Sequence, residues 1–268
     1  MFDDVLNRLP ERDRQRAEEI RVRKSRGVSV TLDDGEIRSV PGCALTIRDV
    51  LARATLNSLH SAQESLRHGY VTAPGGHRVG VCGSAAVKDG ELTAWREIAS
   101  VNIRLCKEVR SVAERAELKP TNFGEDRRPR STLIISPPGA GKTTLLRDLI
   151  RVISERGFRV GAADERGELA AMRDGVPQLD VGSNTDVLEG LPRIDAVMLL
   201  LRSMSPQVIA TDEVTAGSDF DALRQAANCG VKLLATSHRD DSDTSLFERV
   251  VRISVRGGRR VYDVTTLH

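Results

Sequence analysis

Residues 136–144 have the residue types and spacing of a phosphate-binding loop. They read Ser-Pro-Pro-Gly-Ala-Gly-Lys-Thr-Thr and follow the apolar run 132–135. Two glycines allow the backbone to turn with positive φ and to bring its N–H groups close to phosphate oxygens. Lys142 would reach the β- and γ-phosphates of ATP, and Thr143 would hold Mg²⁺. The predicted nucleotide contacts are Pro138, Gly139, Ala140, Gly141, Lys142, Thr143 and Thr144.

The loop departs from the pattern G-x-x-x-x-G-K-[ST] at one position. Ser136 stands where the pattern has its first glycine. We keep the assignment because Gly-Lys-Thr-Thr lies between an apolar run and a helix-like segment that begins at Lys142, which is the strand, loop and helix order that the motif requires. The alternative is a glycine turn before a helix that binds nothing.

Acidic residues and a histidine follow other apolar runs. Asp212 and Glu213 follow the run 208–211, and His238 follows the run 231–235. In this position an aspartate can join Thr143 in the Mg²⁺ shell, and a glutamate can act on the attacking water. We expect the imidazole to contact the γ-phosphate. A third cluster begins with Asp164 and Glu165, again after an apolar run.

The second half of the chain alternates between strand-like and helix-like segments. Strands are expected at 132–136, 159–164, 207–212 and 231–237, helices at 142–156, 191–203 and 218–229, and a hairpin at 249–265. This alternation predicts an α/β domain with a mostly parallel sheet. Because ligands bind at the carboxyl ends of such strands, the loop and the polar clusters should meet at one edge.

The first half reads as a smaller, mixed α/β domain without chemistry of its own. Hairpins are expected at 28–40 and 69–83, a further strand at 98–105, a helix at 47–59 capped by Thr46, and a short helix at 61–67. Pro, Gly, Asn and a run of arginines interrupt the chain at 120–130. We therefore expect an assembly domain at 1–120 and a P-loop ATPase domain at 121–268.

Composition excludes several classes of partner. The 40 basic and 38 acidic residues leave a formal charge of +2, and only 3% of residues are aromatic, so no nucleic acid is expected. The four cysteines are scattered and do not pair with histidines at zinc-ligand spacing. No apolar run approaches 18 residues. A cytoplasmic location is the expectation.

The sequence resembles the family of sporulation stage III AA proteins, mother-cell ATPases related to those of type II and type IV secretion and of pilus machines. The resemblance covers nearly the whole chain and rests on His68-Gly-Tyr-Val-Thr72, Asp164-Glu-Arg-Gly-Glu-Leu-Ala170 and residues 18–23, 75–80, 96–104, 146–149 and 202–206. It implies a RecA-like secretion ATPase that works as a homo-hexameric ring. It also implies membrane proteins of a sporulation channel complex as partners, with the ATPase at the cytoplasmic face of the membrane.

The resemblance also suggests roles for the polar clusters. Asp212 and Glu213 correspond to the Walker B element, and His238 corresponds to the histidine box. Either Asp164 or Glu165 occupies the water-orienting position of the acidic box, and we favour Glu165. The family tends to have Ile-Gly-Arg after the Walker B acids, whereas this chain has Val-Thr-Ala at 214–216.

A ring places each nucleotide between subunits, and an arginine from a neighbour can neutralise charge on the γ-phosphate. We look for this arginine in the first domain. Arg96 and Arg104 flank an apolar strand, and Arg78 lies beside the turn at 75–76. Surface ion pairing is the alternative role for all three.

Other functions share parts of this pattern. A small-molecule kinase has the same loop but needs a lid, and no arginine-rich insertion is evident between the strands. A scaffold that binds ATP without turnover remains open because of Ser136. A nucleic-acid motor is disfavoured by the near-neutral charge and the few aromatic residues. The sequence favours Mg²⁺-dependent ATP hydrolysis.

Overall fold

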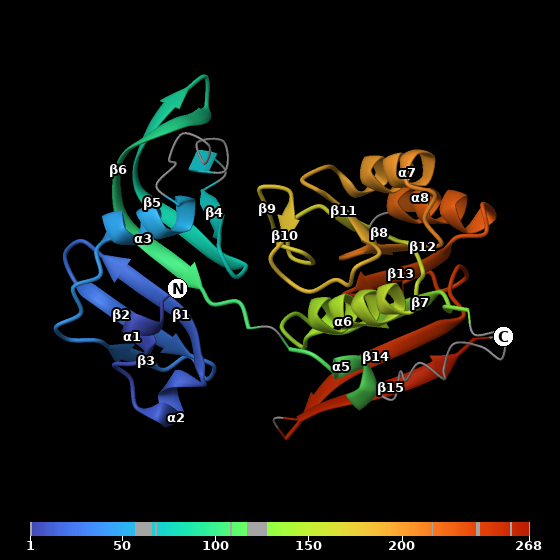
Figure 1. Ribbon diagram of the computed structural model, residues 1–268, viewed down its shortest axis with the longest axis horizontal. Helices are drawn as coiled ribbons and strands as arrows, with labels where there is room; N and C mark the ends of the chain where they lie inside the picture. Colours follow the sequence, from blue (N-terminus) through green and yellow to red (C-terminus); the bar gives the residue numbers. More distant parts are fainter. Residues whose placement is uncertain are drawn as a thin grey trace. The chain divides into compact units, whose positions relative to one another are not determined.

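The chain folds as two compact units, residues 1–107 and 108–268, which are described separately. The computed structural model describes residues 2–56, 66–67, 69–107, 109–116, 128–215, 217–239, 242–257 and 259–267 (Figure 1). The boundary expected between residues 120 and 121 lies outside the described residues. The division falls earlier because α5 (Val112–Arg115) packs in the core of the second unit, where the Ala113 N–H donates to the Asp148 carboxylate at 2.8 Å.

The first unit is built on a six-stranded antiparallel sheet. Its strands are ordered β3-β2-β1-β6-β5-β4. Both expected hairpins are confirmed, but the expected strand 98–105 is the end of a much longer β6. The strands are β1 (Ala17–Arg23), β2 (Gly27–Leu32), β3 (Ile37–Ser39), β4 (Tyr70–Ala73), β5 (His77–Lys88) and β6 (Glu91–Arg104).

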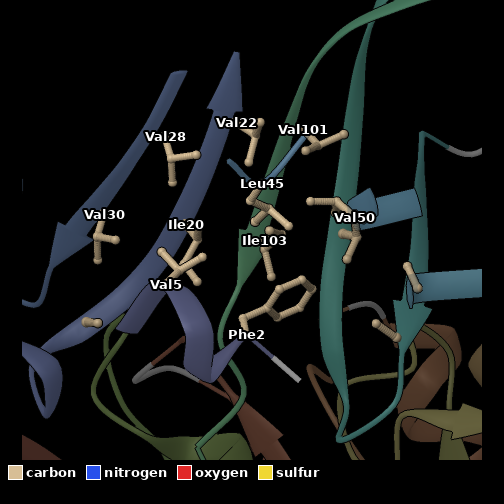
Figure 2. Packing of buried hydrophobic residues seen from close by; sticks show 14 of the residues in the cluster. Phe2, Val5, Ile20, Val22, Val28, Val30, Leu45, Val50, Val101 and Ile103 are labelled. Atoms are coloured by element: carbon tan, nitrogen blue, oxygen red, sulfur yellow. The ribbon is translucent and has the colours of Figure 1, made fainter. Parts of the chain in front are cut away.

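Apolar side chains on one face of this sheet form the core of the first unit. Alternation along β1 buries Ile20 and Val22, and alternation along β6 buries Val101 and Ile103. Figure 2 shows these side chains in one cluster with Phe2, the residue that precedes α1 (Asp3–Leu6). Polar and charged residues predominate on the opposite face of the sheet.

The helix α3 (Ile47–Thr55) covers part of this core. The Thr46 hydroxyl accepts from the Asp49 N–H at 3.2 Å, and the Thr46 N–H donates to the Asp49 carboxylate at 2.9 Å, so the predicted N-cap is confirmed as a capping box. The helix ends before residue 59, where we expected its end, because Leu56 adopts a left-handed φ of 48°. The expected helix 61–67 lies mostly outside the described residues.

The second unit has a seven-stranded sheet, and the predicted mostly parallel α/β architecture is confirmed. Six strands are parallel, and β15 pairs antiparallel with β14 at one edge. In sheet order the strands are β11 (Thr185–Glu189), β8 (Val160–Asp164), β12 (Val208–Thr211), β13 (Lys232–Ser237), β7 (Thr132–Ile135), β14 (Arg249–Arg256) and β15 (Arg259–Thr266). A separate ribbon joins β9 (Met172–Arg173) to β10 (Val176–Pro177).

Helices cover both faces of the seven-stranded sheet. The helix α6 (Lys142–Glu155) lies on one face, and α7 (Arg193–Ser203) and α8 (Gly217–Asn228) lie on the other (Figure 1). Alternate residues of each central strand therefore enter different cores: Ile134 packs with α6, whereas Leu133 packs with α7 and α8. This two-sided burial explains why the strands are continuous apolar runs. The polar residues of these strands therefore lie near the strand ends.

Candidate functional site

The predicted phosphate loop lies between β7 and α6, the strand and helix expected on its two sides. Gly139 and Gly141 have φ of 76° and 102°, so both need the freedom that glycine has. The helix begins at Lys142, which directs the first N–H groups of α6 toward the loop. Ser136 is buried and does not adopt a positive φ, so the missing first glycine of the motif leaves no strain.

Thr143 and Asp212 lie in contact at the edge of the sheet. The Thr143 hydroxyl donates to Asp212 Oδ2 at 2.7 Å. The Thr236 hydroxyl donates to Asp212 Oδ1 and accepts from the Glu213 N–H at 2.8 Å, which fixes the carboxylate on its other side. A hydroxyl and a carboxylate oxygen side by side fit Mg²⁺, which takes oxygen ligands and keeps several of its waters.

Lys142 is joined to Glu213 through the histidine. Lys142 Nζ lies 3.0 Å from His238 Nδ1, and His238 Nε2 lies 2.7 Å from Glu213 Oε1. Because an ammonium can only donate, Nδ1 must accept, which leaves the ring proton on Nε2 to donate to the glutamate. The other glutamate oxygen, Oε2, is 2.5 Å from Arg166 Nη1. The predicted lysine, histidine and glutamate thus lie in one chain of contacts.

Burial and neighbouring charges shift two pKa values within this chain. Burial lowers the pKa of Lys142, and the charges of Asp212, Glu213 and Glu168 oppose that shift. Burial alone would raise the pKa of Glu213, but the hydrogen bond from His238 and the charge of Arg166 outweigh it, so this pKa is lowered. Glu213 is therefore ionised at neutral pH.

The backbone of Glu213 is strained. Its φ is 55°, in the left-handed region that favours glycine. Hydrogen bonds hold this conformation on both sides: the Glu213 N–H bonds to Thr236 Oγ1, and the Val214 N–H donates to the Thr236 carbonyl at 2.8 Å. Glu213 and Asp212 line the same small pocket, and the Glu213 side chain is only 24% exposed.

The two acids at the end of β8 have different surroundings. Asp164 is buried, and its carboxylate accepts three backbone N–H groups at 2.8–3.0 Å, from Glu168, Leu169 and Ala170. Burial raises the pKa of Asp164, and these three bonds oppose that shift. The carboxylate thus closes the turn after β8.

Glu165 is far more exposed than Asp164. Its side chain is 41% exposed and lies 3.0 Å from Arg193, which also pairs with Asp219 of α8 at 3.0 Å. Glu165 and Arg193 line a small pocket together with Asp212 and Glu213. Asp164 lines the same pocket but is buried, so Glu165 is the more accessible of the two acids that the sequence left open.

The difference between these acids predicts different effects of neutralising them. Asp164→Asn is expected to lower the free energy of unfolding by about 1–3 kcal/mol, because its amide NH₂ would face backbone N–H donors. Glu165→Gln, the matched control, should leave stability within about 0.5 kcal/mol because its side chain is exposed. Urea unfolding followed by circular dichroism measures both. Equal losses would contradict the assignment of Asp164 to the turn.

The candidate trans arginines all lie in the first unit. Arg78 and Arg104 are register partners on β5 and β6, on the face of the sheet opposite the core. The Arg78 guanidinium lies 3.7 Å from the centre of the Tyr70 ring. Arg96 is exposed but separated from this pair by bulges between β5 and β6, and it lines a groove beside α3. The structure thus brings Arg78 and Arg104 together and leaves Arg96 apart.

Several residues at the edge of the sheet were not assigned roles from the sequence. Thr236 precedes His238 in a polar cluster, and its position at a strand end was the only signal for it. Arg193 and Arg260 carry no local motif. Arg260 belongs to β15, and its Nε donates to the Ala140 carbonyl of the phosphate loop at 2.8 Å.

A parallel sheet with this loop and these strand-end acids places the chain among the RecA-like secretion ATPase folds. The structure is similar to the pilus retraction motor PilT with bound ADP, with a TM-score of 0.63 and 15% identity over 94% of this chain and 80% of that chain. It is also similar to the ATPase DotB of Legionella pneumophila, with a TM-score of 0.58 and 16% identity over 98% of this chain and 79% of that one. At such low identities the likeness shows the fold.

The family follows from sequence comparison. The family model "Sporulation stage III, protein AA" matches residues 4–260. Stage III sporulation protein AA of Bacillus subtilis strain 168 is 36% identical over 241 residues, which cover 88% of this chain and 77% of the relative. The chain belongs to the sporulation stage III protein AA family, as its motifs indicated. In the part of the chain that the structure describes, no helix has the length and apolarity to cross a membrane.

Proposed function

We propose that the chain hydrolyses ATP in a Mg²⁺-dependent reaction. The observation that carries this proposal is the contact between the phosphate loop and the strand-end residues: Thr143 bonds to Asp212, and Lys142 bonds to His238. These groups follow three different strands, yet they meet where a nucleoside triphosphate on the loop would place its γ-phosphate. The secretion ATPase fold supports the same reaction.

Each residue has a distinct task in this proposal. The N–H groups of residues 138–144 hold the phosphates, and Lys142 exchanges His238 for the β- and γ-phosphates. Thr143 and Asp212 would hold Mg²⁺, which neutralises charge on the phosphates. Glu213, ionised because of its lowered pKa, orients the attacking water by accepting its proton in a hydrogen bond. His238 then faces the γ-phosphate, and Glu165 supports the water from the other side of the pocket.

We further propose that the protein acts as a hexameric ring at the cytoplasmic face of a membrane. Its partners would be membrane proteins of a sporulation channel complex that the ring energises. Family membership supports the sporulation role, and the likeness to the pilus retraction motor PilT supports a motor. In this assembly Arg78, Arg96 or Arg104 of a neighbouring subunit would complete the site.

A scaffold that binds ATP without turnover is the second candidate. One observation favours it: each carboxylate oxygen of Glu213 already accepts one bond, from His238 or from Arg166, so an attacking water must share these oxygens. Release of inorganic phosphate by the purified chain separates the two functions. Sustained release supports the ATPase, and tight ATP binding with no release supports the scaffold.

Lys142→Ala tests the nucleotide site itself. ADP should bind about 10- to 100-fold more weakly, because a charge-assisted bond to phosphate is lost. The melting temperature without nucleotide should stay the same, since the hydrogen bonds of the ammonium within the described residues are to His238 alone. Lys88→Ala removes the same charge from an exposed position in the first unit and is the control. Parental ADP affinity and ATP turnover in Lys142→Ala would refute the phosphate-loop assignment.

A further inference from the structure

The hairpin formed by β14 and β15 flanks the phosphate loop. β14 pairs in parallel with β7, and its residue Arg252 is the register partner of Ile135, the last residue of β7. β14 continues to residue 256, and β15 begins at residue 259. The closed end of the hairpin therefore extends past the carboxyl end of β7, to the side where the phosphate loop begins.

Arg260 joins this hairpin to the loop. Its Nε donates to the carbonyl of Ala140 at 2.8 Å. Its guanidinium also lies against Gly141, since a Cβ built on that glycine would stand 3.1 Å from the arginine Nε. Nε makes the bond, and the terminal nitrogens of Arg260 have no other partner among the described residues. The contact is thus directed at one peptide unit of the loop.

This peptide unit decides where one phosphate-binding N–H points. The Ala140 carbonyl and the Gly141 N–H belong to the same planar trans peptide, so they point in opposite directions. With φ of 102° and no Cβ, Gly141 has little resistance of its own to rotation of that peptide. A donor that holds the carbonyl on the hairpin side therefore holds the N–H on the opposite side of the loop.

We infer that Arg260 is a positioning residue for the phosphate loop. Its Nε–H fixes the Ala140 carbonyl, and the Gly141 N–H is thereby aimed into the phosphate cradle before nucleotide arrives. The inference rests on the proposed nucleotide site and adds a residue outside its motifs. Since preorganised donors bind an anion without first reorienting, the loss of this bond should weaken nucleotide binding more than it weakens the fold.

Glutamine offers a sharp test because its Nε2 is attached to Cδ, as Nε is in arginine. Arg260→Gln keeps a donor at the same depth and removes the charge, whereas Arg260→Ala removes both. ADP affinity of the full chain, measured by calorimetry, should fall roughly tenfold in Arg260→Ala and stay within about threefold of the parent in Arg260→Gln. Melting temperatures without nucleotide should agree among all three proteins.

Arg259→Ala is the matched control. Arg259 is the preceding residue of β15 and pairs with Arg256, so its side chain lies on the other face of the strand. It should bind ADP like the parent. If Arg260→Gln binds as weakly as Arg260→Ala, the arginine acts through its charge and the positioning role is overturned. Parental affinity in Arg260→Ala overturns it as well.

The outcomes also separate this inference from the proposed function. If the parent binds ADP and Lys142→Ala does not, the nucleotide site is supported independently of the results for the Arg260 variants. Full binding by Arg260→Ala would then remove only the positioning role. A parent chain that binds no ADP would overturn both.

Discussion

Mixing two inactive variants, Arg104→Ala and Lys142→Ala, is expected to restore part of the ATP hydrolysis that each has lost. Alone, Arg104→Ala should lower turnover by about 10³- to 10⁵-fold if the arginine acts from a neighbouring subunit. A mixed ring contains interfaces with an intact phosphate loop on one side and an intact arginine on the other. The rate of phosphate release, measured at a series of ratios of the two variants, should therefore be highest at an intermediate ratio.

The surroundings of Arg104 make it the first arginine to test. It is exposed, it lies on the polar face of the first unit's sheet, and no ion pair involves it within the described residues. Its register partner Glu19 is bonded instead to Arg21 at 2.9 Å. Arg104 therefore keeps its charge available, whereas Arg78 lies against the Tyr70 ring.

Arg21→Ala is the control for this experiment. It removes the same kind of side chain from the same face, but one whose charge Glu19 already compensates, so its turnover should stay near that of the parent. Sedimentation with a non-hydrolysable ATP analogue shows whether each variant still assembles. Full activity of Arg104→Ala alone would remove this residue from the site, and Arg78 and Arg96 would then be tested in the same way.

Glu213→Gln should slow ATP hydrolysis by about 10²- to 10⁴-fold while ATP still binds. Glutamine keeps the shape of the side chain, and its one oxygen can accept from either His238 or Arg166. Because Arg166 is exposed, it can turn to solvent when its acceptor is lost, so the fold and the nucleotide site persist. It has no charge and cannot draw a proton from the attacking water. Single-turnover phosphate release, with ATP affinity measured in parallel, separates the chemical step from binding.

Glu165→Gln is the matched comparison for that experiment. Both acids line the same pocket, but Glu165 is more exposed and pairs with Arg193 rather than with the histidine. Its turnover should fall less than that of Glu213→Gln. Normal turnover in Glu213→Gln together with an inactive Glu165→Gln would exchange the roles of the two acids.

The fold of the second unit was predictable because its strands are buried on both faces. Runs such as residues 132–135 and 208–211 have no polar residue except threonine, and glycines or polar clusters mark their ends. β11 was missed because it reads Thr-Asp-Val-Leu-Glu and lies at the edge of the sheet, where burial does not select apolar residues. The length of β5 and β6 was missed because bulges break their alternation; at one of them, a Cβ on Gly83 would lie 1.9 Å from the Glu97 carbonyl.

For the candidate site, the sequence predicted which strand ends come together but not the contacts that their side chains make. Sequence placed Lys142, Asp212, Glu213 and His238 at one edge because parallel strands share a carboxyl end. It left Asp164 and Glu165 open, since their difference depends on three backbone N–H groups that the turn after β8 supplies. It gave no signal for Arg260, whose closeness to the loop depends on the sheet order β7-β14-β15.

The left-handed backbone at Glu213 bears on how selection has acted on this chain. A side chain in that conformation costs about 1–2 kcal/mol, and a glycine would adopt it without the penalty. Selection for stability alone would therefore favour glycine at this position. If Glu213 orients water as proposed, its presence in place of glycine exchanges some stability for activity, as is typical of strained residues at functional sites.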